Sequence, residues 1–338
     1  MTRLLPHLLN NDKGQERIMQ GFLASWRLYG RTDRMLRNVF GILAVLLPLL
    51  LWSAVSYLPF VWHPQVLITD PGGEEYLETG MRMNRVDFLR AVKEMQDQHQ
   101  PAPQGIPTNP VYLPSPGEVL SAFVHAFTSS APVGAEHSIT QAFAHSIRII
   151  FWGFVISSVM GVPLGIMCGS IPAVARLVEP SVDFFRYLPA PAFGALAVAI
   201  LGIYDAPKIA IIVIGTLFQQ ILVIANTTRK LDFALVEASR TLGAKGLRLL
   251  FRVVIPGILP DLYRDQRILL GWAWTYLIVA ELIGTSSGIT WFITQQARYQ
   301  HFDNVFAAMA LIGIVGLGTD MVLGVIGGKL FTWKRENG

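Results

Sequence analysis

Six runs of mostly apolar residues constrain the fold of this chain more than any other feature of its sequence. A helix needs about 20 such residues to cross the hydrocarbon core of a bilayer. The third run is short and follows a proline-rich approach, and the fifth run carries polar residues. The pattern predicts an all-α polytopic membrane protein with six transmembrane helices, at residues 38–58, 147–169, 190–204, 208–226, 268–284 and 305–328.

The composition of the chain favours the same class of protein. Hydrophobic residues make up 52% of the 338 residues and charged residues 15%, whereas an average soluble domain has roughly 25% charged residues. Intrinsic disorder needs low hydrophobicity and high net charge, and the net charge here is only +4. Cys168 is the single cysteine, so a disulfide scaffold is excluded.

The positive charges are divided unevenly between the segments that separate the apolar runs. Segments on one side of the six predicted helices hold 20 Lys and Arg residues, and the alternate segments hold 6. Because cytoplasmic loops are enriched in Lys and Arg, we expect both termini and the loop 227–267 to be cytoplasmic. Residues 1–37 are predicted to be a cytoplasmic interfacial segment, and 331–338 a cytoplasmic tail. The basic charge then reflects topology, and no nucleic-acid partner is expected.

The long segment 59–145 is predicted to be an extracytoplasmic acidic insert. It carries nine acidic and four basic residues and is rich in proline. The apolar spacing predicts an amphipathic helix over 82–98 and an interfacial helix over 117–127.

Three glycines in the second predicted span, Gly161, Gly165 and Gly169, recur at every fourth position. A helix face without side chains lets another helix approach closely. The partner is either another helix of the same subunit, which we favour, or a helix of a second copy.

The cytoplasmic loop 227–262 reads as a helical hairpin. Good helix formers with apolar spacing run from Leu231 to Leu242, and Gly243 suits the end of that helix. A second basic amphipathic helix is expected from Lys245 to Val254, with Pro256 as its stop. Such a hairpin on an exposed loop needs another protein surface to cover its apolar positions.

This loop resembles the signature of permease subunits of binding-protein-dependent ABC importers. The matching residues are Glu237 and Ala238, then Gly243, then the pair Pro256 and Pro260. The resemblance extends over about 113–333 and is strongest to the branch that imports nitrate, sulfonates and taurine. It implies that the loop couples to an ATPase subunit through Glu237, Ala238, Arg240, Gly243, Ala244, Pro256 and Pro260.

The resemblance also implies the architecture and the partners. Residues 146–330 should form a five-helix core of the type I, MetI-like kind in a bacterial inner membrane. The expected partners are a dimer of ATPase subunits, a second permease, most simply an identical copy, and a periplasmic binding protein. The identity of the solute stays open. So does the role of the insert 64–110, which either meets the binding protein or is a passive solvated elaboration.

The chain carries no enzyme motif of its own. Gly327-Gly328-Lys329 lacks the spacing of a nucleotide-binding loop, so ATP and magnesium are expected on the partner ATPase and no cofactor on this chain. The histidines show no spacing typical of metal ligands, and no metal site is predicted.

Polar and aromatic residues of the fourth and fifth spans are candidates for a translocation path. Glu281 and Asp320 are ionisable residues within predicted spans, where a charge is costly unless it is paired or lines the path. Both a structural role and a path role stay open for them. An alternative function is an ion- or proton-coupled secondary transporter that uses Glu281 and Asp320 as a relay. The candidate path residues are Gln219, Gln220, Trp272, Trp274, Thr275, Tyr276 and Glu281.

Overall fold

The computed structural model describes residues 34–58, 62–72, 77–98, 100–128, 138–283 and 287–334. The predicted interfacial helix before residue 34 and the last residues of the predicted tail lie outside these ranges. The chain forms two compact units, Met1–Glu118 and Val119–Gly338.

The first unit contains a long apolar helix, α2 (Arg34–Tyr57), which covers most of the first predicted span. Its leucine-rich surface is largely exposed, as expected for a helix surrounded by lipid. The indole of Trp52 donates a hydrogen bond of 3.1 Å to the carbonyl of Pro114, and the amide of Gly117 donates one of 3.0 Å to the hydroxyl of Tyr57. These bonds tie the C-terminal half of α2 to the chain that leaves the insert.

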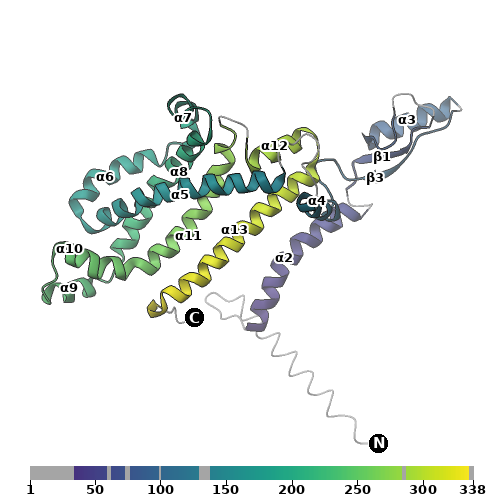
Figure 1. Cartoon of the computed structure of the whole chain (residues 1–338). Helices are drawn as coiled ribbons and strands as arrows, with labels where there is room; N and C mark the ends of the chain where they lie inside the picture. The colour runs from purple at the N-terminus through teal and green to yellow at the C-terminus, as the bar shows by residue number, and fades with distance from the viewer. Residues whose placement is uncertain are drawn as a thin grey trace, which may run out of the picture. The chain divides into compact units, whose positions relative to one another are not determined.

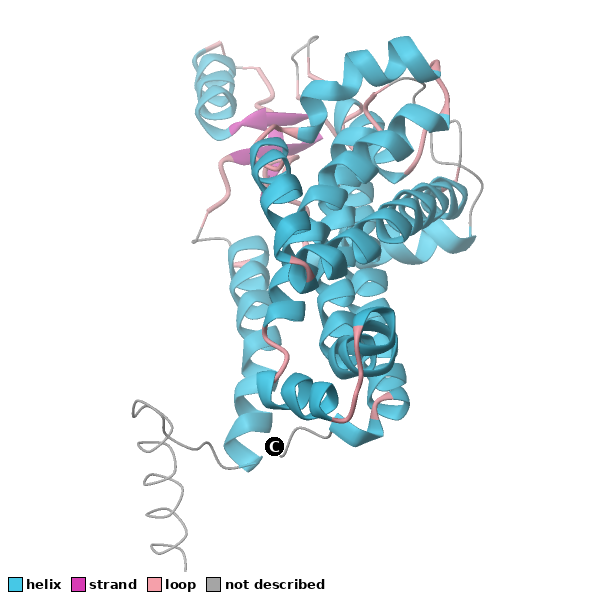
Figure 2. Cartoon of the chain, turned by 90° about the vertical axis from the view of Figure 1, so that its left-hand side faces the viewer, coloured by secondary structure: helices cyan, strands magenta, loops and turns pink. Residues whose placement is uncertain are grey.

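The prediction of an all-α chain is wrong within this unit, because the insert contains a small antiparallel sheet (Figure 2). Val66 and Ile68 alternate with more exposed residues and lie in a cluster with Leu77 and Phe88. Phe88 belongs to α3 (Arg85–Asp97), so the predicted amphipathic helix is present and covers the sheet. The strands, in the order β2-β1-β3, are β1 (Gln65–Asp70), β2 (Arg82–Asn84) and β3 (Gln104–Thr108).

The second unit is helical throughout the residues that the structure describes. A helix at the predicted interfacial position, α4 (Pro116–Thr128), crosses the boundary between the units. The remaining helices are α5 (Ile139–Ser170), α6 (Pro172–Phe185), η1 (Ala190–Phe193), α7 (Gly194–Leu201), α8 (Asp205–Arg229), α9 (Phe233–Thr241), α10 (Gly246–Leu249), η2 (Leu250–Val254), α11 (Ile255–Ala280), α12 (Ile289–Arg298), α13 (Phe302–Leu330) and η3 (Thr332–Lys334).

Helices α5 and α8 lie side by side at the centre of this unit, and the glycine face of α5 makes the contact. A Cβ atom at Gly161 would lie 2.9 Å from the amide oxygen of Gln220, and one at Gly165 would lie 2.8 Å from the carbonyl of Ile221. A Cβ atom at Gly169 would lie closer still, 2.4 Å from the Cβ atom of Thr228. The glycine repeat therefore serves packing inside one subunit, which was the favoured interpretation.

Among the described residues, four helices are long and apolar enough to cross a membrane: α2, α5, α8 and α13. The third predicted span, 190–204, contains only η1 and the short helix α7, which ends at Leu201. This segment is apolar and long enough to cross only together with α6, which it meets at 85°. Counting that pair as one span gives five candidates. The fold is therefore mostly helical with four or five candidate spans.

The fifth predicted span, 268–284, is the second half of the longer helix α11. Pro256 does not stop a helix here. It stands in the first turn of α11, where a missing amide costs little, and the wider π-helical turn η2 precedes it. A π turn removes the crowding that a proline ring imposes on the turn before it. Pro260 is also accommodated inside α11.

Candidate functional site

The predicted coupling hairpin is present as α9, a tight turn, and the α10–η2 segment (Figure 1). The carboxylate of Asp232 accepts a hydrogen bond of 2.9 Å from the amide of Ala234 and so begins α9. Gly243 has a φ of 88°, a conformation that favours glycine, and it reverses the chain. The side chain of Leu231 lies against Gly257 of α11, which fixes the base of the hairpin to that helix.

The hairpin presents apolar side chains that no other part of the described chain covers. Leu242 is 89% exposed and Leu247 is 71% exposed. Phe233 and Phe251 are also more than half exposed. A groove of about 590 Å³ lies between the hairpin and the ends of α5 and α8, and Val236 and Arg240 are among its lining residues. An apolar surface of this kind is typical of a protein–protein contact.

The seven predicted coupling residues do not form one cluster. Glu237, Ala238 and Arg240 lie on α9, and Gly243 and Ala244 form the turn after it. Pro256 and Pro260 lie on α11. The first five are thus together on the hairpin, whereas the two prolines shape the helix that carries it.

The predicted path residues on α11 point in different directions. Trp272 and Thr275 are exposed. Trp274 instead stacks on Phe143 of α5 with ring centroids 6.0 Å apart, and Tyr276 lies against α8. Trp272 and Thr275 therefore stay open to a path or to another chain, and Tyr276 packs between helices. Trp274 packs on α5 and also lines a pocket of about 380 Å³ between α11 and α13.

The two path candidates on α8 also differ. Gln220 is fully buried and joins three helices. Its amide oxygen accepts a bond of 2.8 Å from Ser157, and its amide nitrogen donates to Ser158 at 3.0 Å and to Gln266 of α11 at 3.2 Å. Gln219 is half-buried. Gln220 is therefore a structural junction, and Gln219 remains a candidate for the path.

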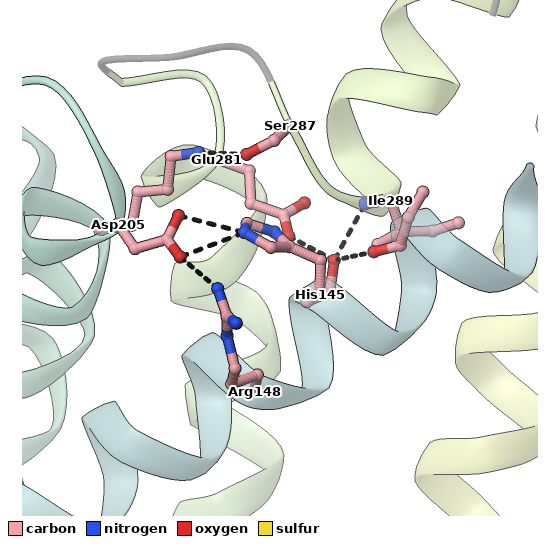
Figure 3. Close-up of polar contacts among 9 residues, drawn as sticks. His145, Arg148, Asp205, Glu281, Ser287 and Ile289 are labelled. Carbon is pink, nitrogen blue, oxygen red and sulfur yellow. Dashed lines mark hydrogen bonds and ion pairs between the residues drawn. The ribbon is translucent and has the colours of Figure 1, made fainter. Parts of the chain in front are cut away.

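A second polar group, the Glu281 cluster, lies where α5, α8, the end of α11 and the start of α12 meet (Figure 3). Asp205 of α8 accepts bonds from Arg148 at 2.6 Å and pairs with His145 at 3.0 Å. Lys208, one turn further along α8, is fully buried and donates a hydrogen bond to Ser287. The cluster consists of His145, Ser146, Arg148, Asp205, Lys208, Glu281, Ser287 and the first residues of α12.

Glu281 is fully buried in this cluster. One carboxylate oxygen accepts the hydroxyl of Ser146, and the other accepts the amide of Thr290 at 2.7 Å. Asp320 of α13, the other acid singled out by sequence, is paired with Arg267 of α11. Both acids thus have partners within the chain.

The sequence pattern missed most members of these groups. Lys208 and Asp205 stand at the first turn of a span, where charges are ordinary, and Gln266 stands in the polar half of α11. One signal was available. An ionisable side chain inside an apolar run needs a partner, and Ser146 and Lys208 are polar residues on neighbouring spans.

Comparison with known proteins places the chain among transport permeases. The sequence profile of a family described as the inner membrane component of binding-protein-dependent transport systems matches residues 161–329. The chain is 33% identical over 229 residues to a probable ABC transporter permease of Brucella abortus strain 2308, covering 68% of this chain and 89% of that protein.

Two relatives have more specific names. The taurine transport system permease protein TauC of Escherichia coli K12 is 27% identical over 68% of this chain and 82% of its own. A putative aliphatic sulfonates transport permease protein of Bacillus subtilis strain 168 is 28% identical, over 66% of this chain and 79% of its own.

Proposed function

Because the chain belongs to the family of inner membrane components of binding-protein-dependent transport systems, we propose that it is the transmembrane subunit of an ATP-driven importer. It is a multi-pass permease and is not itself catalytic. In this proposal it forms the translocation path for a small polar solute that a periplasmic binding protein delivers. A separate ATPase, which holds the ATP and magnesium, supplies the energy.

The proposed architecture is a MetI-like permease with six spans. Four described helices and the bent pair account for up to five of them, and the apolar second half of α11 is the proposed remainder. Residues 146–330 form the five-helix core of this arrangement, and a second permease copy completes the path. Both termini and the hairpin face the cytoplasm of a bacterium, as the distribution of Lys and Arg supports.

The observation that carries the proposal is the uncovered apolar surface of the hairpin. Leu242 and Leu247 extend from a helix pair whose base is fixed to α11 by Leu231 and Gly257. A partner that binds the hairpin can therefore transmit its own movement to α11. An ATPase can drive transport only through contacts that differ between its nucleotide states, and this surface offers such contacts.

The proposed solute is a small polar compound of the nitrate, sulfonate or taurine type. The names of two relatives support the sulfonate and taurine assignment. Glu281 is buried with both carboxylate oxygens hydrogen-bonded, so it presents no exposed negative charge to such an anion. Trp272, Thr275 and Gln219 are the proposed path residues that remain open to it.

The test is reconstitution of the permease with its ATPase and binding protein in proteoliposomes. We expect the subunits to co-purify, and we expect taurine or an aliphatic sulfonate to stimulate ATP hydrolysis and to be taken up only with ATP. A panel that also contains nitrate and simple amines identifies the class. Uptake driven by a proton gradient without ATP would contradict the proposal and favour the secondary transporter.

The structure gives the secondary transporter little support. A relay through Glu281 and Asp320 needs carboxylates that can exchange protons or ions along a route. Glu281 is fully buried with both oxygens bonded, and Asp320 is paired with Arg267.

A further inference from the structure

Helix α12 begins where side chains from two other helices meet its first amides. The amide of Ile289 donates a hydrogen bond of 2.8 Å to the hydroxyl of Ser146, and the amide of Thr290 donates one of 2.7 Å to the carboxylate of Glu281. The first amides of a helix have no partner within the helix. They are usually capped by the side chain of the residue just before it.

The residue just before α12 is Gly288, which has no side chain to act as a cap. Its φ of 92° is one that other residues rarely adopt, and a Cβ atom at this position would overlap the carboxylate of Glu281. Gly288 thus leaves the space that the carboxylate occupies. The cap of α12 is supplied by α5 and by the end of α11 instead.

The environment of Glu281 suits a fixed cap better than a moving group. A carboxylate is favoured at a helix N-terminus by the dipole of the helix. Its burial would be costly without partners, and the hydroxyl of Ser146 and the nearby charge of Lys208 supply them. Lys208 in turn donates to Ser287, on the connection between α11 and α12.

We propose that Glu281 is a positioning residue whose carboxylate caps α12 from the end of α11 and so sets the orientation of α12. This role in transport rests on the proposed function, in which α12 lies at the end that receives the solute. The coupling hairpin lies at the other end of α11 (Figure 1). Glu281 thereby ties the receiving end to the helix that the ATPase moves.

Replacement of Glu281 by glutamine tests whether α12 needs the hydrogen bonds of this side chain or its negative charge. In Glu281→Gln, the amide oxygen can accept from Thr290, and the amide nitrogen can donate to the oxygen of Ser146. The hydroxyl of Ser146 can then donate to the carbonyl of Ala142, which lies at 3.1 Å. The cap survives without the charge. In Glu281→Ala the amide of Thr290 loses its acceptor, and only the bond from Ile289 to Ser146 remains.

The direct test is hydrogen exchange of the full chain in detergent, read from a peptide that contains Ile289 and Thr290. We expect exchange to become about tenfold faster in Glu281→Ala, the size expected for a lost cap, and to stay within about twofold of the original in Glu281→Gln. This readout does not depend on transport, so it tests the cap even if the proposed function fails. Unchanged exchange in Glu281→Ala would overturn the proposal.

Uptake by the reconstituted complex is the second readout. We expect Glu281→Ala to lose at least about fivefold in uptake, again the scale of a lost cap, and Glu281→Gln to retain most of it. Asp303→Asn, an acid in the first turn of α13, is the matched control and should leave uptake unchanged. Equal loss in the Ala and Gln variants would show that the charge is required, and would overturn the proposal.

Gly288→Ala keeps the proposal testable if Glu281→Ala does not accumulate in the membrane. The added methyl group displaces the carboxylate from its site without removing its charge. We expect the same faster exchange and the same loss of uptake. Normal exchange and normal uptake in Gly288→Ala would contradict the cap.

Discussion

The ring of Tyr276 on α11 lies against Gly215 on α8, so closely that a Cβ atom at position 215 would meet three ring carbons at 2.7 to 2.8 Å. The contact joins the central helix pair to the helix that carries the coupling hairpin. It also gives one candidate path residue a packing role.

Gly215→Ala should therefore destabilise the permease by about 1–3 kcal/mol, since the added methyl group overpacks a close helix contact. Thermal unfolding of the purified protein measures this. Gly313→Ala on α13 is the matched control, because nothing lies within 4 Å of a Cβ atom there, and it should be neutral or slightly stabilising. Equal melting temperatures for the two variants would contradict the prediction.

Substitutions at Gln220 and Gln219 can distinguish a structural role from a role in the translocation path. Gln220→Leu removes the acceptor of the buried Ser157 hydroxyl and one of the two hydrogen bonds that the amide oxygen of Gln266 accepts, the other coming from Ser158. The change should cost about 1–3 kcal/mol. Gln219→Leu should change stability little, because Gln219 is only half-buried, and should change the uptake of solute if it lines the path. Unfolding and uptake are measured on both variants, and a destabilised Gln219→Leu with normal uptake would refute the distinction.

The ion pair between Arg267 and Asp320 joins α11 to α13 through two hydrogen bonds, of 3.0 and 2.9 Å. Removal of either partner leaves a charge unpaired on a candidate span or beside one. A double-mutant cycle with Arg267→Met and Asp320→Leu should give a coupling energy of about 0.5–2 kcal/mol. A coupling energy near zero would show that the pair does not hold the two helices together.

The hairpin variants test coupling itself. Leu242→Asp places a charge at an apolar position that is 89% exposed. Gly243→Pro alters the turn of the hairpin, and Glu237→Arg alters the helix before it. We expect normal insertion, loss of co-purification with the ATPase for Leu242→Asp, and ATP hydrolysis uncoupled from uptake for the other two. Asp183→Asn on α6 is a control at an exposed ion pair away from the hairpin. Normal uptake by Glu237→Arg and Gly243→Pro would refute the coupling assignment.

Hydropathy predicted the long apolar helices. α2, α5, α8 and α13 were found because every turn of such a helix is apolar, so length alone reveals it. The run 190–204 stood out only as short and preceded by prolines, and the 85° bend between it and α6 was not predicted. The start of α11 was missed because proline was interpreted as a stop, whereas a π turn and the first helical turn accommodate Pro256.

The hydropathy pattern did not predict short strands or helices that mix polar and apolar residues. β2 has three residues and pairs with β1 only through the fold. Helix α12 mixes polar and apolar residues, and its cap comes from Ser146 and Glu281, which are 135 positions apart. A contact between residues so far apart in the sequence cannot be predicted from the spacing of neighbouring residues. The need of Glu281 for a partner was predictable, and the identity of the partner was not.

The small sheet has a consequence for how such a chain can change. Gln65 at the start of β1 is paired with Thr108 at the end of β3, and its side chain accepts a bond of 3.3 Å from the amide of Val111. The chain therefore enters and leaves the small sheet at neighbouring positions. Removal of the segment between these two strand ends would therefore leave chain ends that lie next to each other and that a short linker can join.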